Sequence, residues 1–323
     1  MNNPGSPHLL DINSLGSHQL NSIIGMALKI AEDPQGYSGR LNGKVMMNLF
    51  MEPSTRTRTS FELAAKRLGM QVINFHPESS STVKGEALSD TFDTLQSMQP
   101  DVIVVRHQQD GTVAELAASA DAGIHVINAG DGCSQHPTQA LLDAVTLMRV
   151  RGDLTGLKVT YVGDIKHSRV ARSGIALLQK LGVAEIRLAG PAGLLPDEKG
   201  VAGHAGSDSS VGNNSVTNSG VVRHFHNLDE AVTGADVVIM LRIQRERFAK
   251  AEQLDESGYF DAWALTPERL LLAADDCNVM HPGPVNRGVE IASEVVDGPQ
   301  SLIRAQVLNG VYTRMSVLLN LVR

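Results

Sequence analysis

Short apolar runs alternate with amphipathic stretches along most of the chain, and this alternation sets the expected fold. After the apolar run at residues 41–50, apolar side chains recur at i, i+3, i+4 and i+7, the spacing of one helical face: Phe61, Ala64, Ala65 and Leu68. A second such pattern starts at about Pro137, a residue suited to the first turn of a helix. Apolar runs at residues 71–75, 101–106 and 123–128 predict further strands.

The same alternation begins again in the second half of the chain. Strand candidates lie at residues 157–163, 184–190, 221–225, 235–241 and 277–282. Two consecutive sets of strand–helix units predict an α/β protein with two doubly wound parallel-sheet domains, each with its site at the carboxyl ends of the strands. We place the domains at residues 1–150 and 151–301, and we expect a C-terminal helix at residues 302–323 to join the first.

A polar segment interrupts the second set of strands and helices. Residues 200–220 read GVAGHAGSDSSVGNNSVTNSG, a low-complexity sequence rich in Gly, Ser and Asn. Such a composition favours a mobile surface loop, and we assign it no chemistry.

Composition limits the classes of function. The 323-residue chain is 42% hydrophobic and has no apolar run near the ~18–20 residues that cross a bilayer. Its net charge of -7 argues against a nucleic-acid-binding surface, so any arginine cluster must serve something local and anionic. The N-terminus lacks a basic region followed by an apolar one, and Cys133 and Cys277 have no metal-ligand spacing. We expect a reduced cytoplasmic protein without disulfides.

The most informative stretch is PSTRTRTSFELAAKRLG, which begins at Pro53. It concentrates hydroxyl and guanidinium groups at residues 54–60, where a strand is expected to end and a helix to begin. Unpartnered backbone N–H groups and the helix dipole favour an anion at such a position. An ordinary N-cap with solvated arginines is the alternative, but seven polar residues exceed what a cap needs. We predict a phosphate site, and one that is not a Walker loop because residues 54–60 contain no glycine.

Other polar side chains lie at or just beyond predicted strands: Arg106, His107, His136, Arg169, Arg242 and Gln244. Any one alone would be typical of a solvated charge or a structural histidine. Because sites in open parallel sheets form at the carboxyl ends of strands, their recurrence favours convergence on one cleft. No metal or paired-carboxylate spacing, and no dinucleotide-binding glycine pattern, is found around Asp131, Asp143 and Asp164. We expect neither a metal nor a cofactor.

These motifs carry a family resemblance. The elements STRTRTSFE, VVRH, QHPTQ, GDIKHSR, LRIQRER and HPGP occur in order from about residue 40 to the C-terminus. Together they resemble catalytic chains of the aspartate carbamoyltransferase branch of the aspartate/ornithine carbamoyltransferase superfamily. The STRTR and HPTQ elements resemble both branches, whereas LRIQRER and HPGP resemble the aspartate branch. The clear departure is the polar insertion at about residues 203–220, which touches no motif.

The resemblance implies a reaction. The carbamoyl group of carbamoyl phosphate would pass to the amine of L-aspartate, giving N-carbamoyl-L-aspartate and phosphate in de novo pyrimidine biosynthesis. The first domain would bind carbamoyl phosphate, the second L-aspartate, and the active site would lie in the cleft between them. Carbamoyl phosphate is already activated, so orienting two anions and stabilising the developing oxyanion would supply the catalysis.

The resemblance also implies roles for individual residues. Carbamoyl phosphate would be bound by Ser54, Thr55, Arg56, Thr57, Arg106, His136, Gln139, Pro282 and Gly283. Of these, the catalytic groups would be Arg56, Thr57, Arg106 and His136. L-aspartate would be bound by Lys84, Arg169, Arg242 and Gln244. A neighbouring subunit would supply Ser80 and Lys84, which lie in the polar loop HPESSSTVKGE.

Two other functions were weighed against this one. Ornithine carbamoyltransferases typically carry DxxxSMG and HCLP elements, where this chain has DVVIMLRIQ and HPGP. A non-catalytic homologue that acts as a scaffold is the other alternative, against which all the positions carried over from the resemblance are intact. The resemblance implies a homotrimer, with a dihydroorotase-like chain or a zinc-bearing regulatory chain as a possible partner. The RIQRER and HPGPVNRGVEI stretches resemble the dihydroorotase-associated group more. The larger assembly and any allosteric effectors stay open.

Overall fold

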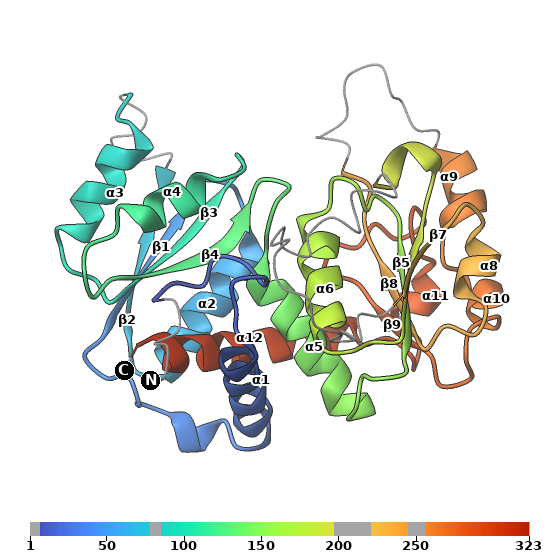
Figure 1. Ribbon diagram of the computed structural model, residues 1–323, viewed down its shortest axis with the longest axis horizontal. Coiled ribbons are helices and arrows are strands. Elements are labelled where there is room, and N and C mark those ends of the chain that lie inside the picture. Colours follow the sequence, from blue (N-terminus) through green and yellow to red (C-terminus); the bar gives the residue numbers. More distant parts are fainter. Residues whose placement is uncertain (1–6, 78–84, 197–220, 245–255, 323) are drawn as a thin grey trace, which may run out of the picture. The chain divides into compact units, whose positions relative to one another are not determined.

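The computed structural model describes residues 7–77, 85–196, 221–244 and 256–322 (Figure 1). The chain divides into two compact units. Unit 1 contains Met1–Val150, Arg172–Leu177 and Ala305–Arg323. Unit 2 contains Arg151–Ala171 and Leu178–Arg304. The C-terminal helix therefore belongs with the N-terminal half of the chain.

Unit 1 is built on a parallel sheet with strand order β2-β1-β3-β4. Its strands are β1 (Val45–Phe50), β2 (Gln71–Phe75), β3 (Val102–His107) and β4 (His125–Asp131). The central strands β1 and β3 are almost entirely buried, as expected where helices cover both faces, whereas the edge strand β2 is partly exposed. From β1 the chain turns first to β2 on one side and then to β3 on the other. The strand order thus reverses between β1 and β3.

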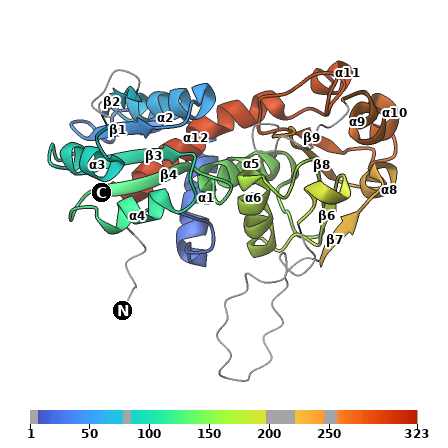
Figure 2. The same ribbon diagram turned by 90° about the horizontal axis from the view of Figure 1, so that it is seen from above.

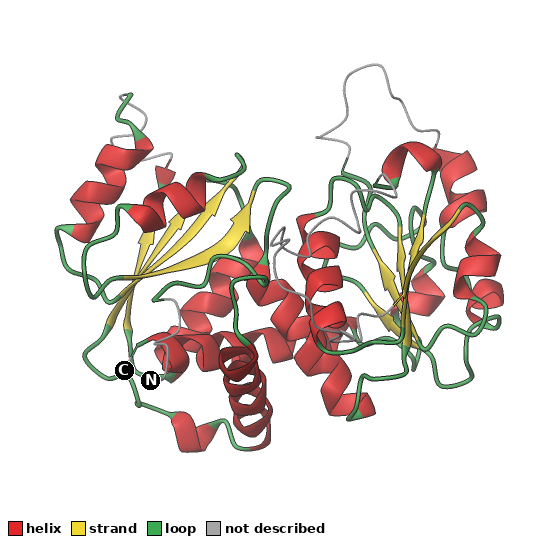
Figure 3. Ribbon diagram, viewed as in Figure 1, coloured by secondary structure: helices red, strands yellow, loops and turns green. Residues whose placement is uncertain are grey.

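Helices cover both faces of this sheet (Figure 3). They are α1 (Ser17–Glu32), α2 (Thr55–Arg67), α3 (Leu88–Gln96), α4 (Thr112–Ala118), α5 (Pro137–Arg151) and α12 (Ile303–Leu321), with a short 3-10 turn η1 (Gln35–Tyr37). Helices α3 and α4 pack on the face that carries Met47, Leu49 and Ile103. On the other side, α12 lies beside α2 and α5 (Figure 2). Both α5 and α12 are buried over most of their length, although each carries polar residues.

Unit 2 repeats this plan with a five-stranded parallel sheet, order β7-β6-β5-β8-β9. Its strands are β5 (Lys158–Val162), β6 (Glu185–Ala189), β7 (Val221–Phe225), β8 (Val237–Met240) and β9 (Asn278–Met280). Here the order reverses between β5 and β8. Gly163, which follows β5, has φ +121° and leaves no room for a side chain, since a Cβ would lie 2.5 Å from the Leu241 carbonyl oxygen. Glycine thus allows the two chain segments to approach closely as they leave the sheet.

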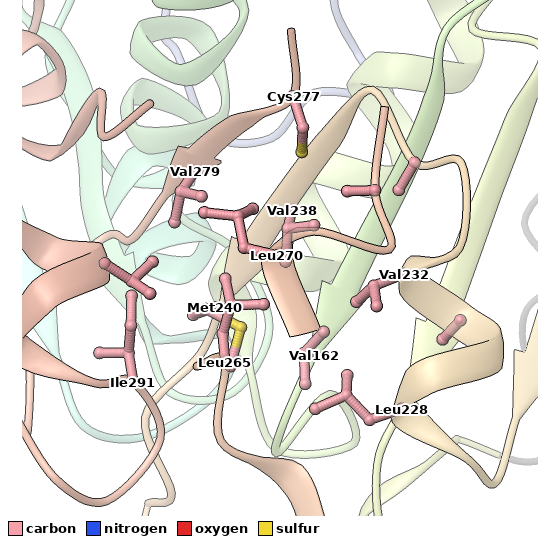
Figure 4. Packing of buried hydrophobic residues seen from close by; sticks show 14 of the residues in the cluster. Val162, Leu228, Val232, Val238, Met240, Leu265, Leu270, Cys277, Val279 and Ile291 are labelled. Carbon is pink, nitrogen blue, oxygen red and sulfur yellow. The ribbon is translucent and has the colours of Figure 1, made fainter. Parts of the chain in front are cut away.

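The helices of unit 2 are α8 (Leu228–Val232), α9 (Glu256–Trp263), α10 (Pro267–Leu270) and α11 (Ser293–Val296), with a 3-10 turn η4 (Ala192–Leu194). Helix α6 (Arg169–Lys180) is divided between the units, since its central residues Arg172–Leu177 belong to unit 1. One face of the sheet and the segments around α8, α10 and α11 form a continuous apolar core. Figure 4 shows its central members: Val162, Leu228, Val238, Met240, Leu265 and Ile291. Because Val162 of β5 and Met240 of β8 are part of this core, it fixes the carboxyl ends of both strands.

The prediction of two parallel-sheet α/β domains is confirmed. Strands form at all the apolar runs named above. The low-complexity segment at residues 200–220 lies outside the described residues, and the cleft between the domains stays a prediction. Among the described residues, no helix has both the length and the apolarity to span a membrane.

Candidate active site

The start of α2, where the sequence predicts an anion site, lacks a side-chain cap from its N-cap residue. Ser54 is the N-cap residue and has an extended backbone, but its side chain makes no capping hydrogen bond to any described residue. Thr55 and Arg56 follow in the first turn and are exposed, while Thr57 is buried. Because the hydroxyl of Ser54 does not serve as a cap, this geometry favours ligand binding over the alternative of an ordinary N-cap.

Arg106 lies next to this helix start because of the sheet register. It ends β3 opposite Phe50, the last residue of β1, so it stands at the point where the strand order reverses. The guanidinium group donates to the Ala129 carbonyl oxygen and to Glu52 Oε1, each at 3.1 Å, and the residue is only 9% exposed. These bonds hold a positive charge in a fixed position at the carboxyl edge of the sheet.

His136, in the loop after β4, and Gln139, in the first turn of α5, follow the carboxyl end of β4. His136 is buried, and its backbone N–H donates to Ser173 Oγ at 2.9 Å. The same hydroxyl donates to Gln135 Oε1 at 2.8 Å. These bonds give a physical reason why Arg172–Leu177, part of α6, belongs to unit 1. The side chain of Gln139 is also buried, and its Nε2 donates to Asp143 Oδ1 at 3.0 Å.

Two buried ionisable residues, Asp143 and Arg314, lie next to these side chains, and neither was predicted from the sequence to support the site. Asp143, on α5, has no metal or paired-carboxylate spacing, and none of the sequence motifs includes Arg314, on α12. Burial raises the pKa of Asp143 to about 7, although hydrogen bonds from Gln306 and Gln139 and the charge of Arg314 oppose the rise. Burial also lowers the pKa of Arg314, which the Asp143 carboxylate opposes. A charged residue inside the apolar run ALLDAV was the available signal.

Unit 2 places its candidate ligands at the corresponding point of its own sheet. Arg169 is the first residue of α6, follows the β5 loop and is 7% exposed. Arg242 and Gln244 follow β8, and Gln244 Nε2 donates to the His167 carbonyl oxygen at 3.0 Å. His167 Nδ1 in turn lies 2.9 Å from Asp164 Oδ1. All three candidates are therefore at the carboxyl ends of the two strands between which the order reverses.

The loop that carries Pro282 and Gly283 is fixed by a buried pair. His281 Nδ1 accepts the Gly283 N–H at 2.8 Å, so this nitrogen carries no proton and the imidazole is neutral. Its Nε2–H therefore donates to Glu290 Oε1, at 3.1 Å. The same carboxylate oxygen accepts the Asn286 N–H at 2.6 Å. Glu290, which sequence analysis did not single out, thus anchors both ends of the loop.

Not every residue named from the sequence can be assigned a place in the site. Ser80 and Lys84 lie outside the described residues. His107, at the end of β3, pairs with Asp131 in the sheet register and was given no ligand role. Within the described ranges, no group of three or more His, Cys, Asp or Glu side chains could hold a metal ion.

Comparison with protein families identifies both halves of the chain. The model described as "Aspartate/ornithine carbamoyltransferase, carbamoyl-P binding domain" matches residues 7–149. The model described as "Aspartate/ornithine carbamoyltransferase, Asp/Orn binding domain" matches residues 155–321. The second match thus extends over α12, which packs in unit 1.

Solved structures similar over almost the whole chain are aspartate transcarbamoylases from Trypanosoma cruzi. The complex with carbamoyl phosphate and aspartate has a TM-score of 0.83 and 30% sequence identity, over 96% of this chain and 95% of that one. The complex with N-(phosphonacetyl)-L-aspartic acid has a TM-score of 0.82 and 30% identity, over 96% and 94%. The complex with aspartate and phosphate has a TM-score of 0.81 and 30% identity, over 96% and 93%.

Replacement of Asp143 by Asn should flatten the pH dependence of stability. The folded-state pKa of about 7 lies above the unfolded value, so burial of the charged carboxylate becomes costly as the pH rises through 7. Between about pH 4 and pH 8, the free energy of unfolding of the wild type should fall, relative to Asp143→Asn, by at most about 4 kcal/mol. Urea unfolding across this pH range measures the fall in the free energy of unfolding. Parallel pH profiles for the two proteins would contradict the prediction.

Proposed function

The chain belongs to the aspartate/ornithine carbamoyltransferase family, and on that premise we propose that it is an aspartate carbamoyltransferase. It transfers the carbamoyl group of carbamoyl phosphate to the amine of L-aspartate and releases phosphate, a step of pyrimidine biosynthesis. One observation carries the proposal. In each of the two parallel sheets, arginine side chains lie at the carboxyl edge where the strand order reverses. The first sheet also has an uncapped helix start at this edge. The resemblance to enzymes solved with both substrates supports it.

Unit 1 is the carbamoyl phosphate-binding half of this proposal. The phosphate binds at the α2 start, through backbone N–H groups and the side chains of Ser54, Thr55, Arg56 and Thr57. The acyl group extends toward the strand ends, where Arg106, Thr57 and His136 face the carbonyl oxygen. Gln139 contacts the amide nitrogen. Donors held in place before the reaction stabilise charge that develops on the carbonyl oxygen.

Unit 2 is the aspartate-binding half. Arg169, Arg242 and Gln244 bind the two carboxylates, and the backbone carbonyls of Pro282 and Gly283 accept N–H groups from the reacting amide or amine. The aspartate amine attacks the carbamoyl carbon, the bond from that carbon to the phosphate oxygen breaks, and the departing phosphate accepts the amine proton. Every group needed for these steps is a hydrogen-bond donor or acceptor, since carbamoyl phosphate is itself activated. The site residues thus orient two anions and stabilise charge.

We further propose a cytoplasmic homotrimer in which Ser80 and Lys84 of one subunit complete the site of its neighbour. A dihydroorotase-like chain is the partner that the RIQRER and HPGPVNRGVEI stretches favour, with a regulatory chain as the alternative. Native mass measurement of the purified protein, alone and after co-purification, tests both statements. A monomer with full activity would overturn the shared site.

Ornithine carbamoyl transfer is the second candidate, because one matching family model covers both substrates. Ornithine carries a cationic side chain, which would be repelled by a second arginine placed for a carboxylate. Formation of carbamoyl aspartate and of citrulline by the purified protein, measured at equal concentrations of the two amino acids, separates the candidates. Absence of both products would favour a non-catalytic homologue.

Arg56→Ala should lower kcat/KM for carbamoyl phosphate by at least about 10²-fold, because charge-assisted hydrogen bonds to an anion are strong and each is worth about 1.5–3 kcal/mol. Arg58→Ala is the matched control. Arg58 lies on the same helix and carries the same charge, but no substrate contact is proposed for it. Steady-state kinetics of both variants, with thermal unfolding to confirm the fold, measure the effect. Equal losses in the two variants would remove Arg56 from the phosphate site.

His136→Ala should lower kcat by about 10²–10³-fold and change carbamoyl phosphate affinity less, as expected for a donor to a developing oxyanion. If His136 only packs at the start of α5, the variant should instead lose thermal stability with little change in kcat. Turnover, carbamoyl phosphate affinity and melting temperature, measured on one preparation, distinguish these roles.

Arg242→Ala should raise KM for aspartate about tenfold or more while the affinity for carbamoyl phosphate changes little, since a paired charge to a carboxylate is lost. Arg223→Ala removes the same charge from unit 2 at the edge strand β7, where the side chain is 63% exposed. Kinetics with each substrate varied in turn measure both. A loss confined to carbamoyl phosphate would reverse the assignment of the two units.

A further inference from the structure

The orientation of the Gln139 carboxamide is determined by its neighbour. Its Nε2 donates to Asp143 Oδ1 at 3.0 Å, and both side chains are at least nine-tenths buried. Asp143 Oδ1 also accepts from a second amide N–H group, so this oxygen acts as an acceptor and the NH₂ end of Gln139 is the end that faces it. The amide oxygen of Gln139 is therefore directed away from Asp143 and is available as an acceptor.

Asp143 is held in place from a distant part of the chain. Gln306 Nε2, on α12, donates to the same Oδ1 at 2.7 Å. With two N–H groups converging on it, this oxygen is an acceptor whatever the charge of the carboxyl group. The chain of bonds thus runs from the C-terminal helix through Asp143 to Gln139, one turn into the helix that His136 precedes.

A second contact ties α12 to both site helices. Arg314 Nη2 donates to Thr138 Oγ1 on α5 at 3.4 Å, and its Nη1 donates to the Gly310 carbonyl oxygen at 3.0 Å. The guanidinium carbon lies 4.9 Å from the centre of the Phe61 ring on α2, a cation–π distance. The helix that starts at the anion site and the helix that carries Gln139 are therefore both fixed against α12.

We propose that Asp143 and Gln306 are positioning residues that make the site selective for an acyl phosphate whose acyl group carries N–H donors. They direct the Gln139 oxygen toward that group, which can pair with a carbamoyl NH₂ but not with the methyl of acetyl phosphate. A buried acceptor left without a donor is costly, so an acetyl group is rejected even though its shape is similar. The inference rests on the proposed function, in which Gln139 faces the carbamoyl amide.

The chain offers a matched control for a purely structural role. Asn309 lies one turn further along α12, and its Nδ2 donates to Thr146 Oγ1 on α5 at 3.0 Å. This bond joins the same two helices, is also buried, and is made one turn further along α5 than the bond from Gln306. Among the described residues, no hydrogen bond joins Asn309 to Gln139. Removal of either bond should weaken the helix contact, but only one should affect the amide.

The experiment compares Gln306→Met, Asp143→Leu and Asn309→Leu with the wild type. For each protein, the inhibition constant of acetyl phosphate is divided by KM for carbamoyl phosphate at saturating aspartate, which gives the discrimination between the two acyl groups. The inhibition constant of inorganic phosphate reports the anion site alone. Both Gln306→Met and Asn309→Leu keep the side-chain size, so the packing of α12 is retained.

We expect discrimination to fall about tenfold in Gln306→Met and Asp143→Leu, the size of one lost hydrogen bond, with the inhibition constant of phosphate within about twofold. Asn309→Leu should lose stability and keep its discrimination. Unchanged discrimination in folded Gln306→Met, or an equal fall in Asn309→Leu, would overturn the inference, and Gln306→Met decides alone if Asp143→Leu does not fold. A wild type that forms no carbamoyl aspartate would instead refute the proposed function.

Discussion

Parallel pairing of β1 with β3, and of β5 with β8, is the constraint on which both candidate sites depend. In each sheet the chain leaves these two strands in opposite directions, so the segments that follow them open a space at the carboxyl edge. Arg106 stands at this position in unit 1 and Arg242 in unit 2. The chemistry of the protein is therefore carried by loops, but its geometry is set by strand register.

The protein is acidic overall, but positive charge is concentrated locally at the candidate sites. The chain has a net charge of -7, yet helix α2 begins with an uncapped turn that carries Arg56, and Arg106 donates to Glu52, which precedes this helix. Fixed donors of this kind do not have to reorganise when charge develops on a substrate, which is the reason they are effective in catalysis. The Glu52 carboxylate also offsets the cost of burying the Arg106 charge.

The buried polar groups next to the candidate sites lower the stability of the fold, but they fix the orientation of the site side chains. Asp143 is costly to bury, and the rise of its pKa to about 7 expresses that cost. In return it fixes the Gln139 amide, while in unit 2 Glu290 fixes the neutral imidazole of His281 and the loop that follows. A fully apolar replacement could make either unit more stable but would leave the candidate site side chains free to rotate.

Local sequence patterns were enough to locate the elements and to predict one site. Periodic apolar residues located the strands and helices, and an anion site at Ser54 to Thr57 could be predicted because its residues are consecutive. Which buried groups meet became known from the fold alone. Gln306 reaches Asp143 across 163 positions, and Glu290 anchors a loop through a histidine tautomer that depends on one backbone N–H. Periodicity is a local property, whereas the partner of a buried polar group is fixed by how distant elements pack.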